Sequence, residues 1–158
     1  MFDKGPYYND PKKASKIIKN LLAGMDVDLA SNATRTADLP IIKAHDSIWR
    51  RLVESSPKGV QRRYTEGMRG YTEGIMAEVT HCSNASLPSL SETLENRRRT
   101  IVTLPSFALL EYACFRLISQ SQANHDTRYG IGLSLPDELF EHPAMKKLHE
   151  VAIDFVLL

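Results

Sequence analysis

Apolar residues recur at steps of three and four over most of this chain, and this spacing constrains the fold more than any other feature. In one segment they stand at Ala14, Ile17, Ile18, Leu21, Leu22 and Met25. In the longest segment they stand at Val60, Tyr64, Met68, Tyr71, Ile75 and Val79. Residues spaced in this way share one face of an α-helix, whereas a half-buried strand needs strict alternation. The sequence has neither strand alternation nor an internal repeat, so the pattern predicts an all-α fold.

Capping residues and prolines predict where these helices begin. The start signals are Asp10 with Pro11, Pro40, Ser56 with Pro57, Ser89 with Glu92, and Pro143. Ser89 and Glu92 have the spacing of a capping box, and Pro105 is expected to kink or restart the helix that they open. The polar segments 28–38 and 119–128 are predicted to be loops.

Composition narrows the class of protein. A length of 158 residues with 42% hydrophobic content suits a single domain spanning residues 1–158. The net charge of +1 argues against nonspecific nucleic-acid binding. Cys82 and Cys114 lie far apart, which argues against a zinc site or a disulfide framework and predicts two buried thiols. With no apolar leader region and no run long enough for a membrane span, we expect a soluble, cytoplasmic protein.

Three groups of side chains are candidates for a site. His142 and His149 are seven residues apart, which is a poor spacing for metal ligands on a helix, so a metal pair is disfavoured. The pair Arg62–Arg63 is expected to lie on a solvated helix face. For the triplet 97–99, successive helical positions point about 100° apart, so at least one arginine is expected to turn toward the packed side and to need an anionic partner. Arginine is also the side chain whose planar fork best holds phosphate oxygens.

The arginine triplet and the segments after it resemble the fungal class I sesquiterpene synthases, of the basidiomycete group that includes the protoilludene synthases. The family pattern is Arg-Arg-x-Thr-Ile-Gly-x-x-Pro-Ser-Phe-Ala-Leu-x-Glu, followed by a Leu-Pro-Asp-Glu turn that ends in His-Pro. The chain matches at Arg97, Arg98, Thr100, Ile101, Pro105, Ser106, Phe107, Ala108, Leu109, Glu111, Leu135, Pro136, Asp137, Glu138, His142 and Pro143. The resemblance spans nearly the whole chain and covers about the middle half of such an enzyme.

The resemblance implies a partial class I terpenoid synthase bundle and a chemistry. Such enzymes bind an isoprenyl diphosphate, farnesyl diphosphate in this group, and ionise it with Mg²⁺ before the cation cyclises. Carried over by position, Arg97 or Arg98 would sense the diphosphate and Phe107 would lie near the isoprenoid chain. Asp3 would be the surviving ligand of the first metal motif, where Lys4 replaces a second acid and would repel magnesium.

The sequence also departs from the family pattern. Val102 stands where the family has glycine, and the stretch 114–131 is an insertion between segments that the family connects almost directly. The second metal motif would follow residue 158. We therefore expect a sesquiterpene synthase homologue that is truncated and inactive as given. The alternative is a noncatalytic α-helical module that binds another protein through exposed apolar faces.

Overall fold

The computed structural model describes residues 7–25, 38–122 and 136–157. Its helices are α1 (Pro11–Ala23), α2 (Pro40–Ser55), α3 (Lys58–Ser83), α4 (Leu90–Thr100), α5 (Thr103–Gln122), α6 (Asp137–Glu141) and α7 (Pro143–Leu157). The described residues contain no strand, which confirms the all-α prediction. None of the described helices is both long and apolar enough to cross a membrane.

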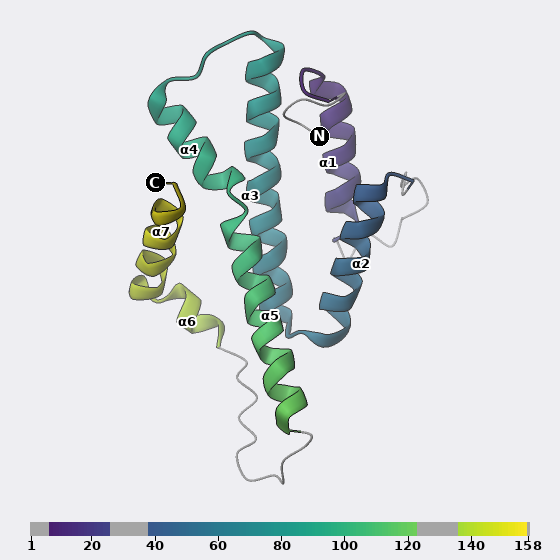
Figure 1. Ribbon diagram of the computed structural model, residues 1–158, viewed down its shortest axis with the longest axis vertical. Coiled ribbons are helices and arrows are strands. Elements are labelled where there is room, and N and C mark those ends of the chain that lie inside the picture. Colours follow the sequence, from purple (N-terminus) through teal and green to yellow (C-terminus); the bar gives the residue numbers. More distant parts are fainter. Residues whose placement is uncertain (1–6, 26–37, 123–135, 158) are drawn as a thin grey trace.

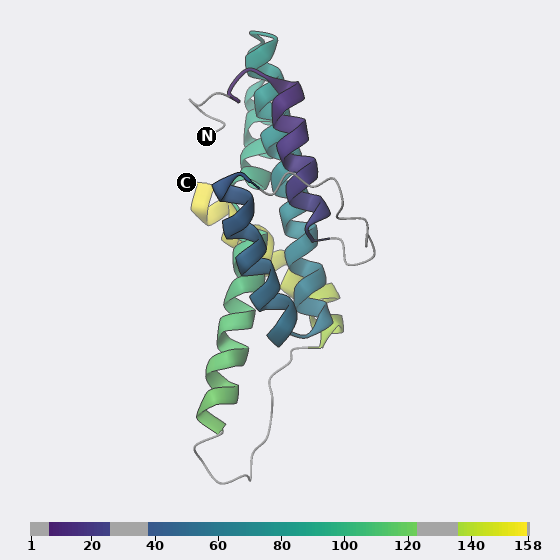
Figure 2. The same ribbon diagram turned by 90° about the vertical axis from the view of Figure 1, so that its right-hand side faces the viewer.

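Helix α3 is the centre of the arrangement. It runs most of the length of the molecule in Figure 1, with α1 and α2 on one side and α4, α5 and the α6–α7 pair on the other. The view turned by 90° in Figure 2 agrees that α1, α2 and α5 lie along α3. Of these neighbours, α5, α4 and α1 make the most extensive contacts with α3. A long amphipathic helix can pack against several neighbouring helices because its apolar residues extend over many turns.

Two apolar clusters hold α3 in place. The larger joins Met25, Trp49, Leu52, Val60, Tyr64, Met68 and Ala108. The smaller joins Ala14, Ile18, Ile75 and Val79. In the larger cluster the Tyr64 ring stacks on Trp49, with centroids 5.9 Å apart, and burial raises the pKa of its hydroxyl. The smaller cluster comes entirely from the two stripes predicted by periodicity, and these stripes also supply Met25, Val60, Tyr64 and Met68 of the larger one.

Two glycines of α3 allow the junction between α4 and α5 to approach closely. A Cβ on Gly67 would lie 2.8 Å from both the backbone nitrogen and Cδ of Pro105, at the start of α5. A Cβ on Gly74 would lie 2.7 Å from Cγ2 of Thr100, at the end of α4. The two glycines are seven residues apart and so lie on the same helix face. Because they lack side chains, the break between α4 and α5 can pack closely against α3.

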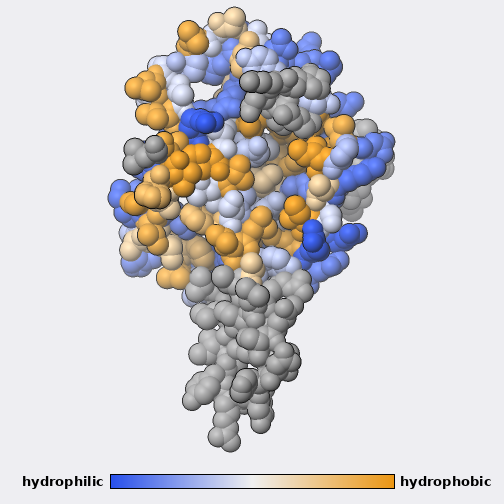
Figure 3. All heavy atoms as spheres, viewed as in Figure 1, coloured by the Kyte–Doolittle hydropathy of each residue, from blue (hydrophilic) through white to orange (hydrophobic). Residues whose placement is uncertain are grey.

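The α6–α7 pair is held more loosely. Of the described residues in these two helices, none is buried. Leu148, Val151, Phe155 and Val156 of α7 are each more than half exposed. Figure 3 shows apolar side chains gathered on the side of the molecule where α4 and α7 lie. The α6–α7 pair therefore depends on a few specific contacts rather than on a shared apolar core.

The predicted helix starts are confirmed to within one residue, and two of them carry side-chain caps. The backbone N–H of Lys13 donates to Asp10 over 3.0 Å, and Ser89 and Glu92 form the reciprocal bonds of a capping box. The predicted loop at 119–128 is wrong in part, since α5 continues to Gln122. The insertion 114–131 thus begins as helix, and its remainder, like Asp3, lies outside the described residues.

Candidate functional site

The arginine triplet occupies the last turn of α4, directly before a break in the helix. The Ile101 N–H still donates to the Arg97 carbonyl over 3.1 Å, whereas Val102 has a φ of 64° and ends the helix. The carbonyl of Val102 then accepts from the N–H of Ser106, so α5 starts at once in a new direction. A β-branched residue is strained in this left-handed region, where glycine is favoured. The departure noted at Val102 therefore falls at the one junction in this segment that suits glycine.

The prediction that one arginine of the triplet turns toward the packed side is wrong. Arg97, Arg98 and Arg99 are all exposed. The reason is that α4 contacts α3 mainly through Asn96 and Thr100, whereas of the triplet only the Cβ of Arg99 comes close to α3, at Gly74. Asn96 and Thr100 both donate to Oε1 of Glu78 on α3, over 3.2 and 3.3 Å.

The three guanidinium groups have different surroundings. Arg98 pairs with Asp154 of α7 over 2.9 Å, with both side chains about half exposed. Arg99 pairs with Glu95 one turn earlier over 3.5 Å. Arg97 and Arg99 also line a cavity of about 820 Å³ between the end of α3 and α4. Exposed arginines of this kind remain accessible to an anion from solvent.

Other polar groups line the same cavity. His81 Nδ1 and Ser86 Oγ form a hydrogen bond of 2.9 Å, and Glu78 and Glu92 add negative charge to the wall. A hydrogen bond with Cys82 raises the pKa of Tyr8. Cys82 is partly exposed, so the prediction of a buried thiol is wrong for this cysteine, and the side chain of Cys114 lies outside the described residues.

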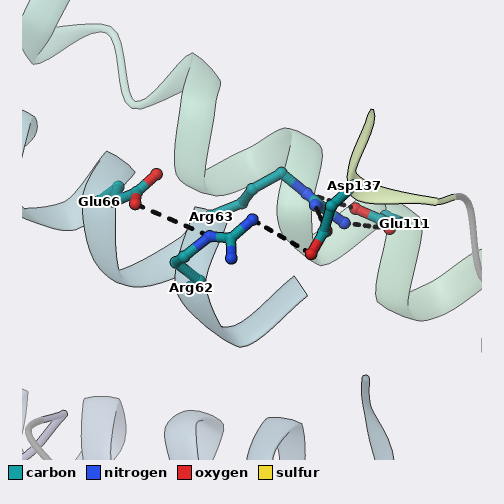
Figure 4. A network of polar contacts seen from close by, with 5 residues as sticks. All are labelled: Arg62, Arg63, Glu66, Glu111 and Asp137. Atoms are coloured by element: carbon teal, nitrogen blue, oxygen red, sulfur yellow. Dashed lines mark hydrogen bonds and ion pairs between the residues drawn. The ribbon is translucent and has the colours of Figure 1, made fainter. Parts of the chain in front are cut away.

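A second polar centre lies where α3, α5 and α6 meet (Figure 4). Arg63 of α3 donates from Nη2 to Oε1 of Glu111 over 2.6 Å and from Nε to Oε2 over 3.2 Å. Its remaining Nη1 donates to Asp137 of α6. Arg62 pairs with the other oxygen of Asp137 over 3.1 Å. The hydrogen bond from Arg63 is the main reason why the pKa of Asp137 is lowered.

Aromatic rings close this centre on one side. The Arg63 guanidinium carbon lies 3.7 Å from the centroid of the Phe140 ring, a cation–π contact. The rings of Phe107 on α5 and His149 on α7 stack with centroids 5.1 Å apart. Arg63, Phe107, Glu111, Phe140 and His149 all line a cavity of about 260 Å³. Phe107 thus lies at this smaller cavity, whereas Arg97 lines the larger one.

The prediction that the Arg62–Arg63 pair is a solvated face holds for Arg62 and is wrong for Arg63. The Arg62 side chain is 56% exposed, whereas those of Arg63 and Glu111 are 16% and 12% exposed. The sequence did contain a signal. Position 63 is three residues after Val60 and four before Gly67, both buried, so it flanks the packed stripe of α3.

Metal-ligating side chains do not gather in the described part of the chain. In residues 7–25, 38–122 and 136–157, no three histidine, cysteine, aspartate or glutamate side chains come together in a way that could hold a metal ion. The residues that the structure describes therefore do not fit a metal centre. His142 accepts from the N–H of Ala144 over 3.2 Å at the start of α7, and His149 stacks on Phe107.

Comparison with known proteins finds a family model and several relatives that match this chain. Residues 1–158 match the family model described as terpene synthase family 2, C-terminal metal binding. Silphinene synthase peniA of Penicillium patulum is 30% identical over 161 residues, which cover 99% of this chain and 38% of that protein. Delta(6)-protoilludene synthase of Cyclocybe aegerita is 30% identical over 112 residues, which cover 71% of this chain and 14% of that protein. These matches confirm the resemblance inferred from the arginine segment.

Solved structures agree with the fold. The crystal structure of the SVS_A2 protein, obtained by ancestral sequence reconstruction, superposes with a TM-score of 0.72 at 20% sequence identity. The superposition covers 96% of this chain and 42% of that one. At this identity the likeness concerns the helical fold alone. The chain spans 38% of the length of the first two curated relatives it matches.

Proposed function

The chain belongs to terpene synthase family 2, and on that premise we propose that it is part of a sesquiterpene synthase that acts on farnesyl diphosphate. In this proposal Arg97 and Arg98, at the end of α4, bind the diphosphate. Phe107, beyond the break, contributes to the wall that surrounds the isoprenoid chain. The observation that carries the proposal is the family match over residues 1–158.

Three features of the chain support this assignment of roles. The triplet stands on the last turn of α4, and its guanidinium groups face solvent, where a diphosphate can reach them. Arginine binds phosphate oxygens through paired N–H donors, which suits the holding of a leaving diphosphate. The cavity of about 820 Å³ beside Arg97 is within the size range of small-molecule sites and supports the role of Arg97 alone, since Phe107 lines the separate smaller cavity.

Farnesyl diphosphate ionises when the bond between its terminal carbon and the diphosphate oxygen breaks. Arginine donors aimed at the departing oxygens stabilise the charge that develops on them, and this lowers the barrier to ionisation. An apolar wall excludes water, which would otherwise capture the carbocation before it cyclises. Mg²⁺ would supply Lewis-acid stabilisation of the same diphosphate only if residues outside the described part of the chain held it. The ligand role of Asp3 stays a proposal, and no described residue is assigned to magnesium.

We further propose that the 158-residue chain alone binds farnesyl diphosphate without converting it. The test is to incubate the purified chain with farnesyl diphosphate and Mg²⁺, to measure binding by calorimetry, and to analyse extracts by gas chromatography and mass spectrometry. We expect binding and no hydrocarbon product. Terpene products would refute the inactivity, whereas a complete lack of binding would refute the assignment of the diphosphate site.

A second candidate function is a noncatalytic helical module that binds another protein. The observation that favours it is the apolar face of α7, where Leu148, Val151, Phe155 and Val156 are exposed. A chain with this function would be folded and monodisperse in analytical ultracentrifugation yet would not bind farnesyl diphosphate. Binding of the diphosphate with micromolar or better affinity would rule this candidate out as the main function.

A further inference from the structure

The α6–α7 pair is attached to the rest of the molecule at a small number of points. At its start, Asp137 meets Arg62 and Arg63 of α3, and Phe140 lies under the Arg63 guanidinium. Further along, His149 stacks on Phe107 of α5. Near its end, Asp154 pairs with Arg98 of α4. With no buried residue among those described in α6 and α7, these contacts decide where α7 lies.

The attachment at Arg63 is the strongest of these contacts. The Arg98–Asp154 pair is about half exposed on both sides, so solvent weakens it. Arg63 is largely shielded, and Glu111 fixes its guanidinium plane with two parallel bonds. Bidentate pairs of this kind are directional, so the free Nη1 of Arg63 is aimed at one point, which Asp137 occupies. Glu111 of α5 thus orients the Arg63 guanidinium group, which in turn holds Asp137 of α6.

The backbone of α3 leaves room for this carboxylate. A Cβ on Gly59 would collide with Oδ1 of Asp137, so Asp137 occupies the space that a side chain at position 59 would take. The residues involved are brought together from distant parts of the chain, since Arg63 and Glu111 are 48 positions apart and Arg63 and Asp137 are 74 positions apart. Glu111 and Asp137 belong to the segments that carry the family resemblance.

We propose that Arg63 is a positioning residue, which uses Glu111 as its support and Asp137 as its anchor to fix α7 so that His149 lies on Phe107. Arg63 is not among the residues assigned above to the diphosphate or to the isoprenoid wall. Its importance for catalysis rests on the proposed function, because Phe107 is the residue assigned there to the isoprenoid wall. The structural part of the proposal stands without that assignment and can be tested in the absence of any diphosphate.

The first test compares hydrogen exchange in the purified chain and in Asp137→Asn. The Asp137 side chain is 42% exposed, so this variant is expected to fold. We expect amides of residues 137–157 to exchange roughly tenfold faster, the change that a loss of about 1.4 kcal/mol produces, with little change in α3. Gly59→Ala should act similarly, because its Cβ displaces Asp137 without removing the charge. The matched control is Glu95→Gln, which breaks the exposed pair with Arg99.

The second test reads the position of α7 directly. In nuclear magnetic resonance spectra, the stack on Phe107 should shift the ring protons of His149 and give cross-relaxation between the two rings. Both signatures should weaken in Asp137→Asn and recover in part in Asp137→Glu, which restores the carboxylate. Unchanged ring signals and exchange rates in Asp137→Asn and Gly59→Ala would overturn the proposal. An equal rise of exchange in α3 and α7 would also overturn it, since Arg63 would then support global stability only.

Discussion

Arg63 and Glu111 form a two-bonded ion pair that joins the central helix α3 to α5, with 16% and 12% of the two side chains exposed. Solvent screens such a shielded pair little, and each group depends on the other for its hydrogen bonds. The pair therefore matters in two ways. It ties two helices together, and it orients the one guanidinium group that reaches α6.

Removal of one partner of this pair should destabilise the chain. Glu111→Gln leaves Arg63 with a single carboxylate, and Arg63→Met leaves Glu111 with an unbalanced charge. We expect each variant to lose about 3 kcal/mol in free energy of unfolding, as is usual when a buried pair is broken on one side. Urea unfolding followed by circular dichroism measures the loss. Arg99→Met breaks an exposed pair between residues one helical turn apart and should lower the free energy of unfolding by less than about 0.5 kcal/mol. Equal losses in all three variants would contradict this account.

Gly67 and Gly70 of α3 should respond oppositely to substitution by alanine. In Gly67→Ala the new methyl group would collide with the backbone of Pro105, so we expect a loss of about 1–3 kcal/mol. Gly70 has nothing within 4 Å of its would-be Cβ, so Gly70→Ala should stabilise the helix by about 0.5–1 kcal/mol. Thermal melts of the two variants give the comparison. A stabilised Gly67→Ala would mean that α5 does not approach α3 as described.

The folded chain should be more stable with glycine in place of Val102. At a φ of 64° the valine side chain carries about 1–2 kcal/mol of strain, which exceeds the roughly 0.5–1 kcal/mol that glycine costs through greater freedom in the unfolded chain. We expect Val102→Gly to raise the melting temperature slightly, while Val102→Ala, which keeps a Cβ, should not. A lower melting temperature for Val102→Gly would indicate that packing of the valine outweighs its backbone strain.

Acid should loosen the α6–α7 pair before the core unfolds. Arg63, then Arg62, lowers the pKa of Asp137 below its ordinary value of 3.8, although burial of the carboxyl group opposes this in part. A lowered folded-state pKa means that the contribution of Asp137 is complete above about pH 4 and is lost as the pH falls through the folded-state value. The protection of α7 amides, measured relative to their intrinsic exchange rates at each pH, should therefore fall below about pH 4, and Asp137→Asn should lack this dependence. If Asp137→Asn shows the same response to acid as the unaltered chain, the effect arises from other carboxylates.

Local signals in the sequence predicted the fold well, whereas the sites depended on contacts that it does not display. The caps at Asp10 and Ser89 act within one turn, so their residue types alone located two helix starts. The arginine triplet is exposed because α4 contacts α3 over a narrow face. Asn96 and Thr100 determine which face this is, through their hydrogen bonds to Glu78. The centre at Arg63 needs three helices to meet, and periodicity within α3 could place Arg63 beside the packed face without naming its partners.

The measurement that tests the central claim most directly is calorimetric titration of the purified chain with inorganic pyrophosphate. If Arg97 and Arg98 form the diphosphate site, Arg97→Gln and Arg98→Gln should each weaken binding by roughly tenfold or more, since a hydrogen bond to a charged group contributes about 1.5–3 kcal/mol. Asp154→Asn should tighten binding, because it releases Arg98 from its ion pair. Arg50→Gln, at an exposed arginine on α2, should bind as the unaltered chain does. Equal affinities in the arginine variants of α4 and α2 would contradict the assignment.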